Sequence, residues 1–138
     1  MKNTITIGYT KFWTDRDDIL YCEFANCETY YKLDLSTVKL YINAIVKLCN
    51  GKSMPFIIDL RGVRGTFSAE AASYFSKSSI LKALIISEAF IVDTINTKLL
   101  ITSYKRIYDP NIPHAVFNEI APALQYCLET KNRFHGSN

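Results

Sequence analysis

The residues best suited to bind a ligand lie in a loop predicted at residues 61–65, which contains two arginines and two glycines. The loop follows a short apolar strand, and open α/β sheets usually bind ligands beyond the carboxyl ends of their strands. Free amides at the start of the next helix attract anions, and arginines add bidentate contacts. A Walker lysine and a Gly-x-Gly-x-x-Gly spacing are missing, so the alternative is a turn with solvated arginines. The candidate anion-binding residues are Arg61, Gly62, Arg64, Gly65 and Ser68.

Nucleophilic catalysis needs a nucleophile beside a base, usually histidine, and the chain has two histidines. His114 opens a predicted strand, where a structural or exposed role is more frequent, and His135 lies near the end of the chain. No Gly-x-Ser-x-Gly elbow is present. Asp59 could act as an acid or base if burial raised its pKa, but an aspartate there more often caps the following loop through backbone amides. We predict no catalytic residue and no enzymatic activity.

Metal chemistry has equally little support. Cys22 and Cys27 have four residues between them, but no second pair with zinc-ligand spacing follows. Asp15, Asp17 and Asp18 lack the glycine and the distal glutamate of a calcium loop, so a solvated hairpin tip is expected. The sequence predicts no metal and no cofactor. The four cysteines are scattered through mostly apolar patterns, which indicates buried free thiols in a reducing cytosol rather than disulfides.

Length and composition indicate one folded domain over residues 1–138. A chain of 138 residues can bury roughly two-thirds of its unfolded surface. The net charge of +3 is too small to indicate a nucleic-acid partner. No apolar run approaches the roughly 18 residues of a membrane span. The first residues carry no signal-peptide core, so we expect a cytoplasmic protein.

The first half of the chain alternates strand and helix patterns. Two period-two segments joined by polar residues predict an antiparallel hairpin, and a continuous apolar run predicts a central strand buried on both faces. Apolar residues spaced by three and four predict the helices. The predicted elements are a strand at Thr4–Phe12, a strand at Ile19–Ala25, a short extended piece within Asn26–Leu35, a helix capped by Ser36 and ending near Asn50, a strand over Phe56–Leu60, and a helix capped by Ser68 and ending near Lys77–Ser79.

The second half continues the alternation. The predicted elements are a strand at Ala83–Ser87, a helix at Glu88–Tyr104, a proline-containing loop at Ile107–Pro113, a strand at His114–Phe117, a final helix that Asn118 caps, and a frayed tail at Lys131–Asn138. This order predicts an α/β fold with a mixed sheet and helices packed on it. The N-terminal hairpin and extended segment take residues 1–35, the alternating core takes 36–130 and the tail takes 131–138. The exposed edge of the hairpin could support a homodimer.

The segment Phe56-Ile-Ile-Asp-Leu-Arg-Gly-Val63, followed by Ser68 at a helix start, resembles the core of STAS domains, the anti-sigma-factor-antagonist family. It is more similar still to the bacterial SpoIIAA-like, or STAS/SEC14-like, group of small domains of uncharacterised function. Ala83–Ser87, Pro113–Phe117 and the helix around Ala123–Leu128 fit the second half of that group. The resemblance covers most of Leu33–Leu128. It implies a SpoIIAA-like fold and a regulatory, non-enzymatic role.

The resemblance also gives Ser68 a family position. In the antagonist family, a partner kinase phosphorylates the first serine of an Asp-Ser-Ser-Gly motif after this strand, and Ser68 aligns with that serine. Phe67, Ala69 and Glu70 stand where the family has Asp, Ser and Gly. We therefore predict that Ser68 is a helix cap and not a phosphosite.

Two functional hypotheses remain open at this point. The first is a non-catalytic regulatory module that acts by binding a protein partner, which the sequence does not identify. The alternative is a carrier or sensor of a small anionic or lipid-like molecule, which the lipid-binding side of the family comparison suggests.

Overall fold

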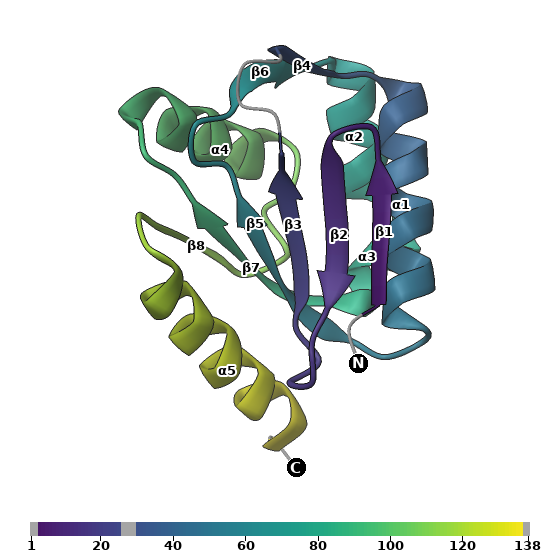
Figure 1. The fold of residues 1–138 in the computed structure, drawn as a ribbon, viewed down its shortest axis with the longest axis vertical. Coiled ribbons are helices and arrows are strands. Elements are labelled where there is room, and N and C mark those ends of the chain that lie inside the picture. The colour runs from purple at the N-terminus through teal and green to yellow at the C-terminus, as the bar shows by residue number, and fades with distance from the viewer. Residues whose placement is uncertain (1–2, 26–29, 137–138) are drawn as a thin grey trace.

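A computed structural model describes residues 3–25 and 30–136 of the chain and shows a six-stranded mixed sheet with helices on both faces (Figure 1). The strands are β1 (Asn3–Ile7), β2 (Thr10–Thr14), β3 (Leu20–Phe24), β5 (Met54–Asp59), β7 (Ile85–Ile91) and β8 (His114–Phe117). Their spatial order is β1-β2-β3-β5-β7-β8. Strand β2 pairs antiparallel with both β1 and β3, and the pairs from β3 to β8 are parallel. The predicted α/β class and mixed sheet are confirmed.

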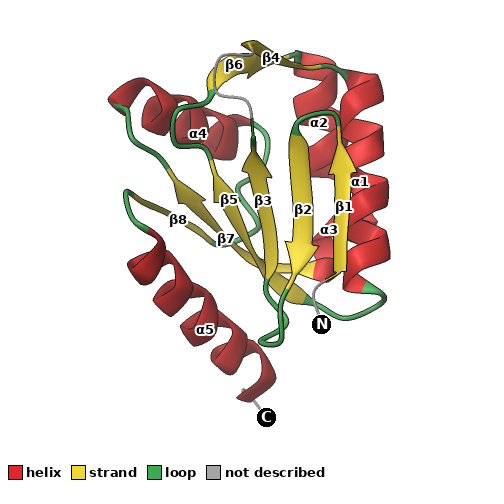
Figure 2. Cartoon of the chain, viewed as in Figure 1, coloured by secondary structure: helices red, strands yellow, loops and turns green. Residues whose placement is uncertain are grey.

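The helices divide unevenly between the two faces of the sheet (Figure 2). They are α1 (Leu35–Cys49), α2 (Ala69–Lys77), α3 (Ser79–Leu84), α4 (Ile95–Ile107) and α5 (Ile120–Gly136). Helix α5 covers one face, and the other four lie on the opposite face. A separate parallel pair, β4 (Tyr30–Leu33) and β6 (Arg64–Phe67), lies beyond the carboxyl ends of β3 and β5. None of the helices described combines the length and apolar character needed to cross a membrane.

Strand β5 is the centre of the core. Its side chains alternate between the faces, so Phe56 packs with α1 and α2 while Ile57 packs with α5. Ile58 is half-buried on the α1 side rather than fully enclosed. The pairing of β5 with β7 shifts register between Met54 and Phe56, around the buried Pro55. Because proline has no amide hydrogen to donate, this irregularity lets it sit inside a sheet.

The N-terminal prediction is partly wrong. The segment predicted as one strand from Thr4 to Phe12 is the hairpin β1–β2, because Gly8 takes a left-handed backbone (φ 59°) and reverses the chain there. The antiparallel hairpin predicted with Ile19–Ala25 is confirmed as β2–β3. Helix α1 begins two residues earlier than expected, because Asp34 rather than Ser36 is its cap, accepting from the amide of Thr37 at 2.9 Å.

The largest error lies after Ser87. The sequence predicts a helix from Glu88, but β7 continues to Ile91 and α4 begins at Ile95, with Thr94 as its cap. Helix α3 was not predicted as a separate element. Helix α5 extends to Gly136, so the frayed tail expected from Lys131 is wrong up to that residue; 137–138 lie outside the described residues.

Candidate functional site

The five candidate anion-binding residues fall in three different elements. Arg61 and Gly62 form a turn after β5, Arg64 and Gly65 belong to β6, and Ser68 follows β6 as the cap of α2. Strand β6 was expected to be loop, and it separates the turn from the helix start. The structure therefore does not assemble the arginines and the helix amides in one continuous loop.

Carboxylates of the protein already accept hydrogen bonds from this turn. Arg61 donates from Nε and Nη2 to the two oxygens of Asp59 at 3.0 and 2.8 Å, and its amide donates to the same group. The amide of Gly62 donates to Asp93 at 2.9 Å. Burial favours a higher pKa for Asp59, but the bonds from Arg61 outweigh it and lower that pKa. Asp59 thus caps the loop through a backbone amide, as predicted.

Ser68 occupies the predicted cap position. Its hydroxyl accepts from the amide of Ala71 at 3.0 Å, and Glu70 places a negative charge in the first turn. That Ser68 is not a phosphosite stays a prediction.

Replacing Ser68 by alanine is expected to lower the free energy of unfolding by about 1 kcal/mol, because one buried first-turn amide loses its acceptor. Replacement by aspartate keeps an acceptor and suits the positive helix end, so it should cost less. Urea melts of both variants measure the difference. Equal losses in the two variants would show that the hydroxyl does not act as a cap.

A large cavity, of about 580 Å³ and partly open to solvent, lies between the sheet, the β4–β6 pair and helices α1, α2 and α4. Its floor is the sheet face that carries Phe12, Cys22 and Phe56. Helices α1, α2 and α4 supply the walls, and the β4–β6 pair supplies the roof. The lining is mainly apolar and aromatic, which is typical of a small-molecule site.

The roof depends on a close approach of two backbones. At Gly65, a Cβ atom would stand 2.3 Å from the carbonyl oxygen of Tyr31. Only glycine permits this approach, so Gly65 serves the β4–β6 pairing and not a ligand turn. Arg64 and Gly65 also border the cavity.

Three tyrosines contribute to the cavity lining, and their hydroxyl groups differ. The hydroxyl of Tyr41 pairs with that of Thr10 at 2.7 Å. Those of Tyr31 and Tyr104 are buried and have no hydrogen-bond partner among the residues described. An unpaired buried hydroxyl costs about 1–3 kcal/mol, so these two groups call for an explanation.

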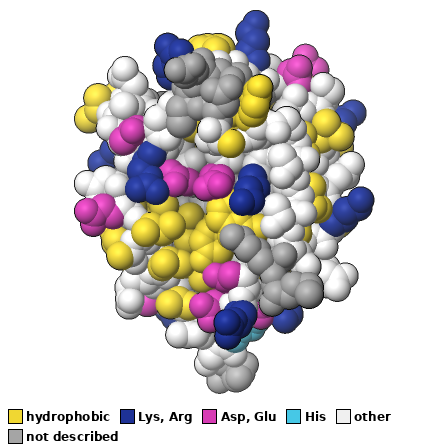
Figure 3. Space-filling model, viewed as in Figure 1, with side chains coloured by type: hydrophobic (Ala, Val, Ile, Leu, Met, Phe, Trp, Pro, Cys, Tyr) yellow, Lys and Arg dark blue, Asp and Glu magenta, His cyan; other side chains and the backbone are white. Residues whose placement is uncertain are grey.

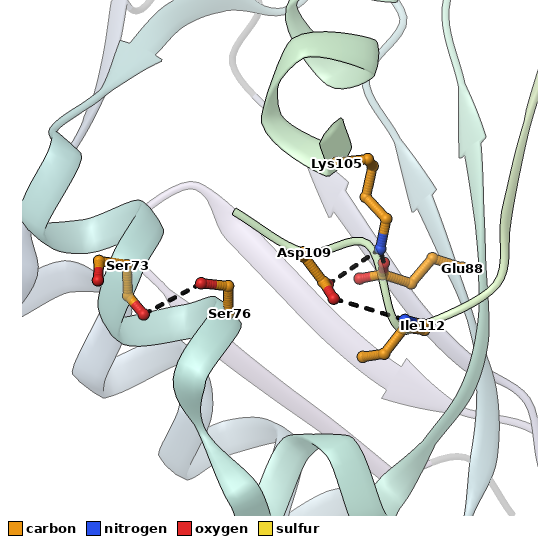
Figure 4. A network of polar contacts seen from close by, with 6 residues as sticks. All are labelled: Ser73, Ser76, Glu88, Lys105, Asp109 and Ile112. Carbon is orange, nitrogen blue, oxygen red and sulfur yellow. Dashed lines mark hydrogen bonds and ion pairs between the residues drawn. The ribbon is translucent and has the colours of Figure 1, made fainter. Parts of the chain in front are cut away.

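A buried ion-pair network stands beside the cavity (Figure 4). The ammonium of Lys105 in α4 donates to Glu88 in β7 at 2.5 Å and to Asp109 at 2.9 Å. All three side chains are at most 3% exposed. Burial raises the pKa of Glu88, and the charge of Lys105 opposes that rise. Glu88 also lines the cavity, so this network places one ammonium and two carboxyl groups at that part of the cavity wall.

The sheet face on the α5 side carries a half-buried aromatic pair. Trp13 and Tyr21 stack with ring centroids 5.0 Å apart, and the ammonium of Lys11 lies 5.2 Å from the Trp13 ring. Figure 3 shows hydrophobic side chains gathered in the centre of this face, with charged groups along its upper border. We call Lys11, Trp13 and Tyr21 the aromatic face.

The other candidate residues do not converge. His114 begins β8 and packs near Phe90, and burial together with Lys105 lowers its pKa. Cys22, Cys49 and Cys127 are free and buried, as predicted, whereas Cys27 lies outside the described residues. Within residues 3–25 and 30–136, no three His, Cys, Asp or Glu side chains group as a metal site.

The cavity was missed from sequence because its lining comes from nearly every element of one face. In the sequence, Tyr31 and Tyr104 stand within ordinary apolar strand and helix patterns, which do not show that both residues line a cavity. The recurrence of tyrosine, nine in 138 residues, was the available signal.

Comparison with solved structures supports the fold. The chain is similar to an uncharacterised protein of the DUF3478 family with a SpoIIAA-like fold, from Shewanella loihica PV-4. The two share 13% sequence identity with a TM-score of 0.53, over 92% of each chain. The SpoIIAA-like fold that the sequence resemblance implied is therefore confirmed.

No curated protein matches the chain. The model of a protein family described as a domain of unknown function, DUF7793, matches residues 12–131. That match runs from the middle of β2 through most of α5 and includes every wall of the cavity. The chain belongs to the DUF7793 family.

Proposed function

We propose that this protein is a non-catalytic carrier or sensor that holds a largely apolar small molecule in the cavity beneath β4 and β6. The observation that supports this proposal is the cavity of about 580 Å³ lined by apolar and aromatic side chains. Small-molecule sites in proteins commonly have this volume and this lining, with few polar groups.

The reactive groups of the lining favour binding over catalysis. Burial raises the pKa of the Cys22 thiol, so the nucleophilic thiolate is disfavoured. Glu88 is held by Lys105 and is not positioned as an unpaired acid or base. We expect the protein to act in the cytoplasm.

Titration with the fluorescent hydrocarbon diphenylhexatriene tests the proposal, since its emission rises when it enters an apolar site. Wild-type protein should bind it saturably. Cys22→Phe on the floor and Ala72→Phe on the α2 wall fill the cavity and should weaken binding about tenfold or more. Thermal melts must show that both variants are folded. Absence of saturable binding by the wild type would reject the proposal.

The aromatic face favours a second candidate, a protein-interaction module of the kind that the family resemblance suggests. A stacked, half-buried Trp–Tyr pair at the surface suits a protein interface, where aromatic residues are enriched. Trp13→Ser separates the two functions: it should leave probe binding in the cavity unchanged. A loss of probe binding in this variant would place the apolar site on the aromatic face instead.

A further inference from the structure

We propose that helix α4 and the mouth of the cavity dock on the surface of an anionic lipid bilayer, from which the protein takes its apolar ligand. This inference rests on the proposed carrier function for the role of the cavity and adds the source of the ligand. Docking itself is measured without a ligand, so the two proposals can fail separately.

The mouth of the cavity lies between β6 and the first turns of α4. Most residues of the lining are buried or half-buried, and the exposed ones come from these two elements. They are Arg64 and Thr66 in β6, Thr94 at the cap of α4, and Asn96 and Leu100 within the helix. Helix α4 lies at the same end of the sheet as the β4–β6 pair (Figure 1). A ligand therefore enters and leaves between β6 and α4.

Helix α4 is apolar on its outer side as well as on the side that packs on the sheet. Four of its large apolar side chains are between 39% and 71% exposed: Ile95, Leu99, Leu100 and Ile107. Their spacing places them on one side of a helix with 3.6 residues per turn, and we call them the α4 stripe. Leu100 also lines the cavity, so the stripe is continuous with the mouth. Clustered exposed apolar side chains of this kind mark an interaction surface.

The charges beside the α4 stripe complement an anionic surface. Lys98 and Arg106 are exposed, and residues 95–107 contain no aspartate or glutamate. The two flanking acids, Asp93 and Asp109, accept hydrogen bonds from within the protein. Exposed apolar residues beside basic ones are typical of helices that bind at the boundary between lipid headgroups and acyl chains.

A bilayer explains the position of the α4 stripe better than a protein partner does. A protein partner would bury the same side chains, yet its binding would not require them to border the mouth. An apolar ligand avoids water and collects among acyl chains. When the mouth is seated on the bilayer, such a ligand passes between the membrane and the cavity without crossing water.

Flotation of the full chain with lipid vesicles tests this inference. The vesicles are phosphatidylcholine alone, or phosphatidylcholine with about one third of the anionic lipid phosphatidylglycerol. Wild-type protein should float with the anionic vesicles, and added salt should weaken this binding. The double variant Ile95→Ser, Leu99→Ser should bind about tenfold more weakly, because two side chains no longer enter the apolar layer. Lys98→Gln and Arg106→Gln should each weaken binding to the anionic vesicles about fivefold.

Two controls separate docking from other effects of the substitutions. Ile80→Ser removes an exposed isoleucine of α3 that belongs neither to the stripe nor to the cavity lining, and it should float as the wild type does. The substituted residues of α4 do not line the cavity, so their variants should keep the wild-type affinity for diphenylhexatriene in solution. Thermal melts must show that every variant is folded.

The two proposals fail in different ways. If the wild type does not float with anionic vesicles, or if the serine variant floats equally well, membrane docking is overturned whatever the probe titration shows. Equal binding to both kinds of vesicle would overturn the assignment of an anionic surface. Self-association that the serine variant abolishes, without vesicle binding, would assign the α4 stripe to a second copy of the chain. Vesicle binding without any binding of diphenylhexatriene would reject the carrier function and keep α4 as a membrane-binding helix.

Discussion

Replacing Lys105 by methionine is expected to lower the free energy of unfolding by about 3–5 kcal/mol. Methionine fills much of the same space, so the main loss is electrostatic. Glu88 and Asp109, each 1% exposed, would face each other without the ammonium that now binds both. An uncompensated buried charge is among the most destabilising changes that a folded protein can undergo.

The loss should depend on pH. Burial raises the pKa of Glu88 in the wild type, and removing Lys105 raises it further. A group whose folded-state pKa is raised stabilises the fold below its unfolded pKa, and that contribution disappears as the pH rises through the folded pKa. The deficit of Lys105→Met relative to wild type should therefore shrink as the pH falls from about 7 to about 5.

Urea melts at several pH values measure this effect. Lys98→Met provides the matched control, since Lys98 lies on the same helix but is exposed. It should change the stability by less than about 0.5 kcal/mol. A loss under about 1 kcal/mol in Lys105→Met, or one that does not vary with pH, would show that the network is not the stabilising element inferred here.

Ile57→Ala is expected to cost about 2–5 kcal/mol. Ile57 is 1% exposed and packs with Ala123 and Cys127 of α5, in a cluster where little can move to refill the space. The removed methyl and methylene groups would leave a void in a close-packed interior. Denaturant melts give the loss directly.

The neighbouring residue offers the control. Ile58→Ala makes the same chemical change on the opposite face of β5, where the side chain is half-buried and already borders the large cavity. Because fewer packing contacts are lost there, the cost should be below about 2 kcal/mol. Equal losses of stability in the two variants would mean that Ile57 and Ile58 are equally well packed, which would contradict a cavity beside Ile58.

The course of the chain around β5 could be predicted where local patterns decide the structure. The apolar run at Phe56–Ile58 is a strand, and Ser68 is a cap, because both follow from short-range chemistry. The same logic failed at Glu88, since a glutamate inside a buried strand is acceptable only with a cationic partner. That partner, Lys105, is 17 residues further along the chain, and the local sequence pattern does not show that the two side chains meet in space.

The candidate anion loop failed for a similar reason. Two glycines and two arginines after a strand are a reasonable signal for an anion, and the sequence alone leaves their donors available. In the fold, Asp93 accepts from Gly62 although 31 residues separate them, and Gly65 serves the roof. The sequence likewise could not show that the buried hydroxyls of Tyr31 and Tyr104 lack a partner among the described residues, because this depends on how the whole fold packs around them.

The β4–β6 roof has a consequence for the rate at which a ligand leaves. It pairs four residues with four residues and shares no strand with the six-stranded sheet. Local opening of such a small unit requires only part of the global free energy of unfolding, and leaves the ladder of the main sheet intact. Under the proposed carrier function, weakening this pair should therefore speed ligand release with little change in the melting temperature of the domain.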